Sequence, residues 1–298
     1  MAVCIWLGTT DSSWSTATNW SGGAVPGSGD TAVIPANATV DIDGSDETSS
    51  PIDKLVIEKG CSISIGSVDT PLKLSFSGET NAEAHLAGTG VKYLDLTEAK
   101  AIYITEAGGA STIGAYALNL TATSATNSTK LYIDADDSDD IGIAANGGDV
   151  GEFDNIYISG GNITIGESVS KIDGTSAPPI VISGGTVETK CKLDTASVAN
   201  ATWTHSNGTV SSASVINGTL YLNTNDTITT LHLGKNAKLD ATGSAVSKTI
   251  TTLEMTASSA VNDPQKTISI GTLKLLNCGF RDITLDVGRN WSVSLTSL

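Results

Sequence analysis

Basic residues are scarce in this 298-residue chain, which carries 16 lysines and arginines against 32 aspartates and glutamates and has a formal charge of −16. The two arginines, Arg281 and Arg289, both lie close to the C-terminal end. Contacts to phosphate groups need clustered Lys and Arg side chains, and no stretch of the chain supplies them. The composition argues against nucleic acid as a partner and fits an acidic, soluble surface.

Cysteine and histidine pairs at metal-ligand spacing are also missing. The cysteines form no C-x-x-C motif, and no histidine has a second histidine or cysteine at ligand spacing. These residues are Cys4, Cys61, Cys191, Cys278, His85, His205 and His232. We therefore expect free cysteines that behave as small apolar residues, and no zinc site.

Long apolar segments are absent as well. Residues 1–10 contain no basic region and no apolar run of signal-peptide length, and no later segment is long enough to span a membrane. We expect a chain that is not marked for secretion and does not enter a membrane.

An internal repeat is the strongest positive signal. Three segments, 228–233, 250–255 and 270–275, align without gaps on the pattern apolar-x-x-apolar-x-apolar. The same pattern occurs at 52–57, 91–96, 115–120 and 153–158. Its trailing alternation has the period of two that is typical of a short strand with one face inward.

A second set of copies places turns between the strands. Segment 156–163 contains Ser-Gly-Gly and is matched one repeat later by 180–187, and a weaker copy with Ser-Asn-Gly follows at 203–210. The Gly-Gly and Asn-Gly steps are typical of turns that need a positive φ. A strand, turn, strand and corner that recur about every 20–24 residues indicate a parallel β-helix, in which stacked coils share one core.

The predicted fold class is therefore all-β, with a β-solenoid over residues 51–298 and a separate N-terminal segment over residues 1–50. Two tandem β-sandwiches are the alternative, because their strands also alternate and are joined by Gly- and Asn-rich turns. Side-chain matches between the copies favour the solenoid. It predicts six side chains that point inward and stack in columns, namely Leu231, Leu233, Leu253, Met255, Leu273 and Leu275.

Residues 5–34 differ from the rest of the chain. Trp6, Trp14 and Trp20 lie close together and are followed by the turn sequence Val-Pro-Gly-Ser-Gly-Asp at 25–30 and an apolar strand that ends at Ile34. The order Trp, Trp-Ser, Asn-Trp, Gly, Pro-x-x-Gly-Asp and strand resembles the opening of repetitive β-helical surface proteins, namely bacteriophage virion decoration or fibre proteins and autotransporter-like bacterial exoproteins. The resemblance is confined to this segment and implies an architecture rather than an activity.

Two roles follow for this Trp-rich segment. It can cap the first coil, whose open end would expose apolar side chains and unpaired strand edges. Its tryptophans can also bind a partner, because tryptophan is favoured at the centres of interfaces. Trp6, Trp14 and Trp20 are therefore the predicted partner-binding residues.

Acidic clusters at 134–140 and 41–47 have the charge for calcium. Segment 134–140 lacks the glycine and the glutamate that an EF-hand loop requires at its sixth and twelfth positions. We therefore expect solvated acidic turns and no metal, and the absence of G-x-S-x-G and Walker A motifs leaves no catalytic residue and no cofactor to predict.

An enzyme that cleaves polysaccharides needs paired carboxylates. Asp134 and Asp154 could stack on adjacent coils, but without a cation between them they would repel each other. Sugar binding also favours exposed aromatic residues, which are thinly scattered outside the N-terminal segment. These observations argue against an enzyme.

We predict a non-enzymatic structural protein of a bacteriophage virion, either a capsid decoration or head fibre or a small tail appendage, exposed on the virion surface. Its expected partners are other capsid or tail proteins and further copies of the chain; the resemblance implies a trimer. A host-surface glycan is a further candidate partner. The alternatives are a bacterial adhesin or surface-layer protein, which would need export signals, and a tailspike-like enzyme that degrades polysaccharide.

Overall fold

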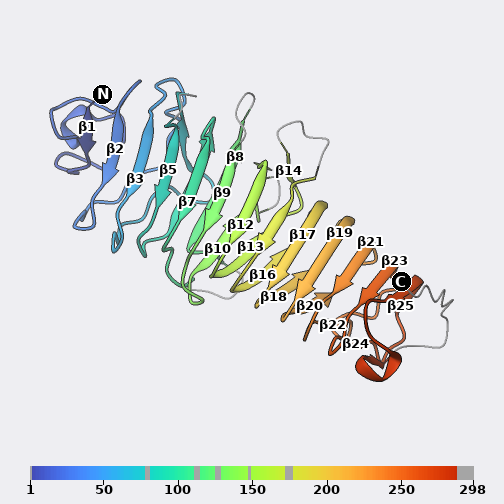
Figure 1. Cartoon of the computed structure of the whole chain (residues 1–298). Coiled ribbons are helices and arrows are strands. Elements are labelled where there is room, and N and C mark those ends of the chain that lie inside the picture. The colour runs from blue at the N-terminus through green and yellow to red at the C-terminus, as the bar shows by residue number, and fades with distance from the viewer. Residues whose placement is uncertain are drawn as a thin grey trace. The chain divides into compact units, whose positions relative to one another are not determined.

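The computed structural model describes residues 2–77, 81–110, 115–124, 129–146, 149–171 and 177–286. These residues form short strands, turns and two single-turn 3-10 helices, η1 (Ala17–Asn19) and η2 (Phe280–Asp282). The chain divides into two compact units, Met1–Ser176 and Ala177–Leu298. Figure 1 shows that each unit is built from successive short strands. The predicted all-β class is confirmed.

Two parallel sheets form the walls of the first unit. The first has the order β1-β2-β3-β5-β7-β9-β12. Its strands are β1 (Val3–Ile5), β2 (Thr31–Ile34), β3 (Lys54–Ile57), β5 (Glu83–Leu86), β7 (Ala101–Ile104), β9 (Lys130–Ile133) and β12 (Asn155–Ile158). The second has the order β4-β6-β8-β10-β13, with β11 and β14 following β8 along its edge. Its strands are β4 (Leu72–Ser75), β6 (Lys92–Thr97), β8 (Leu118–Thr123), β10 (Asp140–Ile143), β11 (Gly151–Glu152), β13 (Asn162–Ile165) and β14 (Val169–Ser170).

Two parallel sheets also form the walls of the second unit. One has the order β15-β17-β19-β21-β23-β25 and the other β16-β18-β20-β22-β24-β26. The first comprises β15 (Ile180–Ile182), β17 (Leu193–Ala199), β19 (Val210–Ile216), β21 (Thr227–Leu233), β23 (Lys248–Met255) and β25 (Ile268–Leu275). The second comprises β16 (Thr186–Thr189), β18 (Thr202–His205), β20 (Thr219–Leu222), β22 (Lys238–Asp240), β24 (Ala260–Asn262) and β26 (Thr284–Asp286).

The pairings between these strands are parallel and link successive coils. Parallel strands need a crossover connection, so the chain passes from one wall to the other before it returns one coil further on. Each unit is a parallel β-helix, as the repeat predicted. The alternative of tandem β-sandwiches is wrong, because the sheets of such sandwiches are antiparallel.

The six side chains predicted to stack inward do so in two columns on β21, β23 and β25. One column is Leu231, Leu253 and Leu273, and the other is Leu233, Met255 and Leu275. Five of the six are fully buried, and Leu275, on the last strand of its sheet, is half-buried. The prediction is confirmed because positions two apart on a strand face the same side.

The predicted spacing of the repeat is confirmed for β21, β23 and β25. It is wrong for other coils, whose lengths vary more than the repeat suggested. In the sheet that begins with β1, the register partners Glu83 and Ala101 are the closest in sequence, and Lys54 and Glu83 are among the most distant. In the sheet that begins with β15, the closest register partners in sequence are Ile180 and Ala196, and the most distant are Thr227 and Thr249.

Two of the aligned copies also lie on a different wall from the others. The copies at 91–96 and 115–120 belong to the opposite wall from 52–57, and Leu94 pairs with Leu120 rather than Leu118. Both walls have a period of two, so alternation alone does not tell them apart.

The weaker copy at 203–210 is also displaced, because Trp203 is the register partner of Val187 rather than of Ile180. The turn prediction is confirmed: Gly161, Gly185 and Gly208 have φ of 100°, 78° and 91°. At Gly208 a Cβ would also lie 2.4 Å from the carbonyl carbon of Cys191.

The boundary predicted at residue 50 falls after the sheet has begun. β1 and β2 lie within residues 1–50; β1 pairs with β2, and β2 pairs with β3. The N-terminal segment therefore supplies the first strands of a solenoid wall. At the other end, residues 287–298 of the predicted solenoid lie outside the described residues.

Candidate functional site

The three predicted partner-binding residues gather into one cluster at the start of the first unit. The Trp20 ring centroid lies 5.2 Å from that of Trp6 and 4.6 Å from that of Trp14, both edge-to-face at 72°. Trp20 Nε1 donates to the Trp14 carbonyl at 2.7 Å, and Trp6 Nε1 donates to the Val40 carbonyl at 3.1 Å. All three side chains are buried, with 1–2% exposure.

The neighbouring motif residues explain why this segment folds as it does. Asn19 is fully buried; its Nδ2 donates to Asp11 Oδ1 at 2.7 Å and to the Ser13 carbonyl at 2.9 Å, and its Oδ1 accepts from the Thr10 backbone N–H at 2.9 Å. Asp30, which ends the Pro-x-x-Gly-Asp turn, accepts from the Ala2 N–H at 2.7 Å. A buried amide with its partners satisfied fixes the loop that carries the tryptophans.

Burial changes the role that these tryptophans can play. The Trp6 backbone N–H donates to the Val33 carbonyl on β2 at 2.8 Å, so the cluster is attached to the first coil. An indole that is 1–2% exposed has little surface for a partner, which favours capping. Partner binding by these residues stays a prediction and requires the cap to open.

Three of the side chains that the N-terminal segment exposes are aliphatic and lie on or next to β1. Val3, Ile5 and Leu7 are 62%, 38% and 51% exposed and alternate with the buried Cys4 and Trp6. Sequence reasoning missed them because a run that is apolar on both faces does not show which face is outward.

Asp134 and Asp154 do not form the carboxylate pair considered for polysaccharide cleavage. Asp134 directly follows β9, and Asp154 directly precedes β12. Because Lys130 pairs with Asn155, the two carboxylates stand at opposite ends of neighbouring strands, about 16 Å apart along the strand direction. Asp134 Oδ1 instead accepts from Ser159 Oγ at 2.7 Å.

The acidic turn at 134–140 forms hydrogen bonds to the neighbouring coil. Asp139 is 4% exposed and accepts from the Gly108 N–H at 2.7 Å, and Asp140 accepts from the Ala110 N–H at 2.8 Å. The expectation of a solvated turn is therefore wrong for Asp139. In the described part of the chain, no group of three or more His, Cys, Asp or Glu side chains could hold a metal ion.

A groove of about 520 Å³ lies on the outer face of β4, β6 and β8 in the first unit. Its floor consists of outward side chains that the register sets in rows. Lys73, Asp95 and Thr121 form one row, and Tyr93 and Asn119 form the next. Thr123 extends the floor along β8. The inward neighbours on these strands, such as Leu94, are buried in the core.

Residues beside β4 and β8 form the two sides of the groove. Residues 44–46 and 68–71 lie beside β4, where the Lys73 N–H donates to the Ser45 carbonyl at 2.8 Å. Asn146, Asp149 and Val150 lie beside β8, where the Ala122 N–H donates to the Val150 carbonyl at 3.3 Å. Asn146 Nδ2 donates to Asn119 Oδ1 at 3.2 Å, so this side is tied to the floor. Asn119 is 7% exposed and also donates to the Tyr116 carbonyl at 3.1 Å, which fixes its amide.

The groove is acidic. Asp46, Asp69, Asp95 and Asp149 line it, and Lys73 is the one cation among the described residues that do so. The Thr48 hydroxyl and backbone N–H donate to the Asp46 carboxylate and hold its pKa below the usual value, to which Lys73 adds a smaller effect. This carboxylate is charged at neutral pH.

Sequence reasoning missed the groove because its residues come from different coils. Lys73, Asp95 and Thr121 belong to three successive coils and occupy outward positions, where the repeat leaves the residue type free. The uneven coil lengths removed the periodic signal that could have found them.

Aromatic residues of the first unit are also gathered rather than scattered. His85, Tyr103, Tyr132 and Tyr157 stack on the outer face of β5, β7, β9 and β12, with ring centroids 4.7, 5.0 and 5.0 Å apart. Their ring faces contact one another, so the ladder presents mainly ring edges to solvent. The expectation of thinly scattered aromatics is therefore wrong for this wall.

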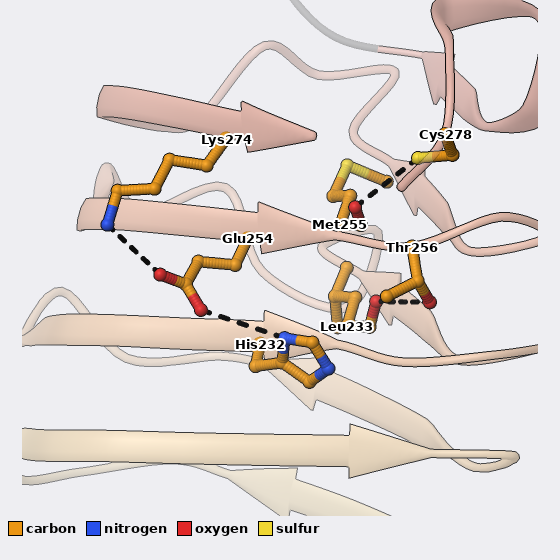
Figure 2. A network of polar contacts seen from close by, with 7 residues as sticks. All are labelled: His232, Leu233, Glu254, Met255, Thr256, Lys274 and Cys278. Atoms are coloured by element: carbon orange, nitrogen blue, oxygen red, sulfur yellow. Dashed lines mark hydrogen bonds and ion pairs between the residues drawn. The ribbon is translucent and has the colours of Figure 1, made fainter. Parts of the chain in front are cut away.

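The outer wall of the second unit carries a charged ladder instead. Figure 2 shows Glu254 between His232 and Lys274. Glu254 Oε1 lies 3.1 Å from Lys274 Nζ, and its Oε2 lies 3.7 Å from His232 Nδ1. His232 is partly exposed on the outer face of β21 and is the register partner of Glu254. These groups are partly exposed, so each ion pair contributes at most about 1 kcal/mol.

Comparison with known proteins finds no matching family, curated protein or solved structure. Among the described residues, no helix has the length and apolar character needed to cross a membrane.

Proposed function

We propose that the protein is a non-enzymatic structural component of a bacteriophage virion, a β-helix displayed on the particle surface as a capsid decoration, head fibre or small tail appendage. The observation that carries this proposal is the folded N-terminal segment. The Trp and Asn-Trp elements that resemble virion β-helical proteins here form a buried cluster, which is hydrogen-bonded to the first coil through the Trp6 N–H and the Val33 carbonyl. A capped solenoid is suited to standing at a surface without edge-to-edge aggregation.

A structural role also agrees with how the acidic residues are used. Asp139 and Asp140 accept hydrogen bonds from backbone N–H groups of a neighbouring coil. Asp134 and Asp154 are too far apart to act as a catalytic pair. The partners proposed are other capsid or tail proteins and further copies of the chain, a trimer among them. The exposed Val3, Ile5 and Leu7 are the part of the N-terminal segment that an attachment would use.

Three measurements test the proposal. Antibodies against the purified chain should label the surface of phage particles from the source culture, and mass spectrometry should find the chain in those particles after purification. Its absence from purified particles would overturn the proposal. In parallel, the purified protein should release no reducing or unsaturated ends from a panel of bacterial and algal polysaccharides. Turnover that Asp95→Asn abolishes would establish the enzyme alternative.

A further inference from the structure

We propose that the groove over β4, β6 and β8 binds a short oligosaccharide of neutral sugars or amino sugars, without cleaving it. The inference rests on the display function proposed above, because a displayed solenoid meets glycans of a cell surface. It adds a specific site and the chemical class of its ligand.

The floor of the groove fits a ligand rich in hydroxyl groups. Asp95 offers an acceptor, Lys73 offers a donor and Asn119 offers both. Thr121, whose hydroxyl donates to the Leu94 carbonyl at 3.4 Å, offers an acceptor. These side chains lie on adjacent parallel strands about 4.8 Å apart, so they present a fixed grid of polar groups. Asn119 is fixed before any ligand arrives, because it is buried and bonded to Tyr116 and Asn146.

Apolar surface in the same groove favours a ligand that also has C–H faces. Tyr93 lies on the floor, and Val68 and Val150, on opposite sides, are 61% and 41% exposed. Carbohydrates combine hydroxyl groups with C–H faces in this way. A groove of about 520 Å³ falls within the usual range for small-ligand sites, roughly 300–1,000 Å³.

A peptide is a poorer fit to this floor. Extended peptides bind to sheets mainly by adding a strand at a free edge, where backbone groups are unpaired. Here β6 pairs with β4 on one side and β8 on the other. The floor therefore offers side chains and no free backbone hydrogen bonds.

The charge of the groove selects among carbohydrates. Four aspartates and one lysine give the groove a formal excess of three negative charges. Polysaccharides that carry phosphate or carboxylate groups are therefore repelled, whereas neutral sugars enter freely and protonated amino sugars are attracted.

The test is binding of the full chain to an array of neutral, amino-sugar and acidic oligosaccharides, followed by calorimetric titration with the best ligand. Tyr93→Ala and Asp95→Asn should each weaken binding about tenfold or more. Tyr221→Ala is the matched control, because Tyr221 is a partly exposed residue on β20 that lies outside the groove. Unchanged melting temperatures separate loss of the site from loss of the fold.

Any of three results would overturn the inference: no neutral or amino-sugar ligand on the array, a preference for acidic glycans, or binding that survives both groove variants. Ligand turnover would replace it with the enzyme alternative. Particle labelling does not depend on the groove, so labelled particles whose protein binds no glycan contradict this inference alone. Glycan binding by a protein absent from particles contradicts only the virion proposal.

Discussion

Each unit of this chain has two parallel β-sheets as its walls, and the units differ in the lengths of their corners. In the sheet that begins with β1, register partners are as far apart in sequence as Lys54 and Glu83, and the long connections of that unit form the sides of a groove. In the sheet that begins with β15 the most distant partners are Thr227 and Thr249, which are closer. Stacked inward side chains fix the register of both, so a solenoid tolerates long corners and can carry a binding site on them.

The two units also differ in the side chains on the outer faces of their walls. The first unit has a stack of aromatic rings, whereas the second has a column of hydroxyl side chains, namely Thr195, Ser212, Thr230, Thr252 and Thr272. Each unit also contains a buried lysine whose ammonium group donates to two backbone carbonyls. Lys92 Nζ donates to the carbonyls of Gly88 and Gly90 at 2.6 Å each, and Lys248 Nζ donates to those of Ser244 and Val246 at 2.6 and 2.8 Å.

The largest effect is expected in the two cores. Leu131 and Leu253 are each 0% exposed, so Leu131→Asp and Leu253→Asp place a charge in an apolar column. Each should lower the free energy of unfolding by more than about 4 kcal/mol in urea titrations followed by circular dichroism. The exposed Thr251→Asp is the control and should change it by less than about 0.5 kcal/mol. A mild effect in one core alone would show that the units are not equivalent.

The next effect concerns the cap of the first unit. Trp20→Ala should cost about 3–5 kcal/mol, as expected for loss of a buried aromatic side chain. A chain lacking residues 1–24 should lose the cooperative melting of the first unit in calorimetry. Ile5→Ser, at an exposed position of β1, should leave melting intact and weaken attachment to particles. If the truncated chain melts normally, the segment attaches rather than caps.

Removing either buried lysine is expected to have a smaller effect on the free energy of unfolding, with a distinct pH dependence. Lys92→Met and Lys248→Met should each cost about 1–3 kcal/mol, because two carbonyl oxygens lose their donor. Burial lowers the pKa of Lys92 to about 8, whereas an unfolded chain has about 10.4. Between these pH values the unfolded state holds more protons, so the parent gains stability relative to Lys92→Met as pH rises.

Burial also lowers the pKa of Lys248, so its variant should show the same direction. Urea titrations at several pH values between about 7 and 10 measure both differences. A constant difference between the parent and Lys92→Met would contradict the proposed effect of burial.

The smallest effect is expected at the surface ion pairs. Glu83 lies 3.5 Å from Lys54 Nζ and 3.1 Å from His85 Nε2. Like Glu254 it contacts one lysine and one histidine, but His85 is on the same strand as Glu83. Glu83→Gln and Glu254→Gln should each cost less than about 1 kcal/mol, and the loss should shrink at high salt. Thermal melts at low and high salt measure this. A loss that does not change with salt would show that packing, not charge, is responsible.

The sequence reveals inward positions better than outward ones. Leu231, Leu253 and Leu273 were predictable because a buried position restricts residue type and therefore repeats. Tyr93 and Asp95 were not, because an outward position accepts many residues and only the register brings them beside Asn119. The corner lengths that set this register follow from turn geometry, which composition does not encode.

The stacked rings of Tyr103, Tyr132 and Tyr157 also give the first unit a spectroscopic signal of its own. Their centroids are 5.0 Å apart and their planes nearly parallel, at 8° and 9°, so their electronic transitions couple. Near-ultraviolet circular dichroism reports such fixed aromatic packing and loses its signal when packing is lost. These rings stand on three successive strands of one wall, so the coupled tyrosine band is an intrinsic spectroscopic probe of whether those coils remain in register, with no label added.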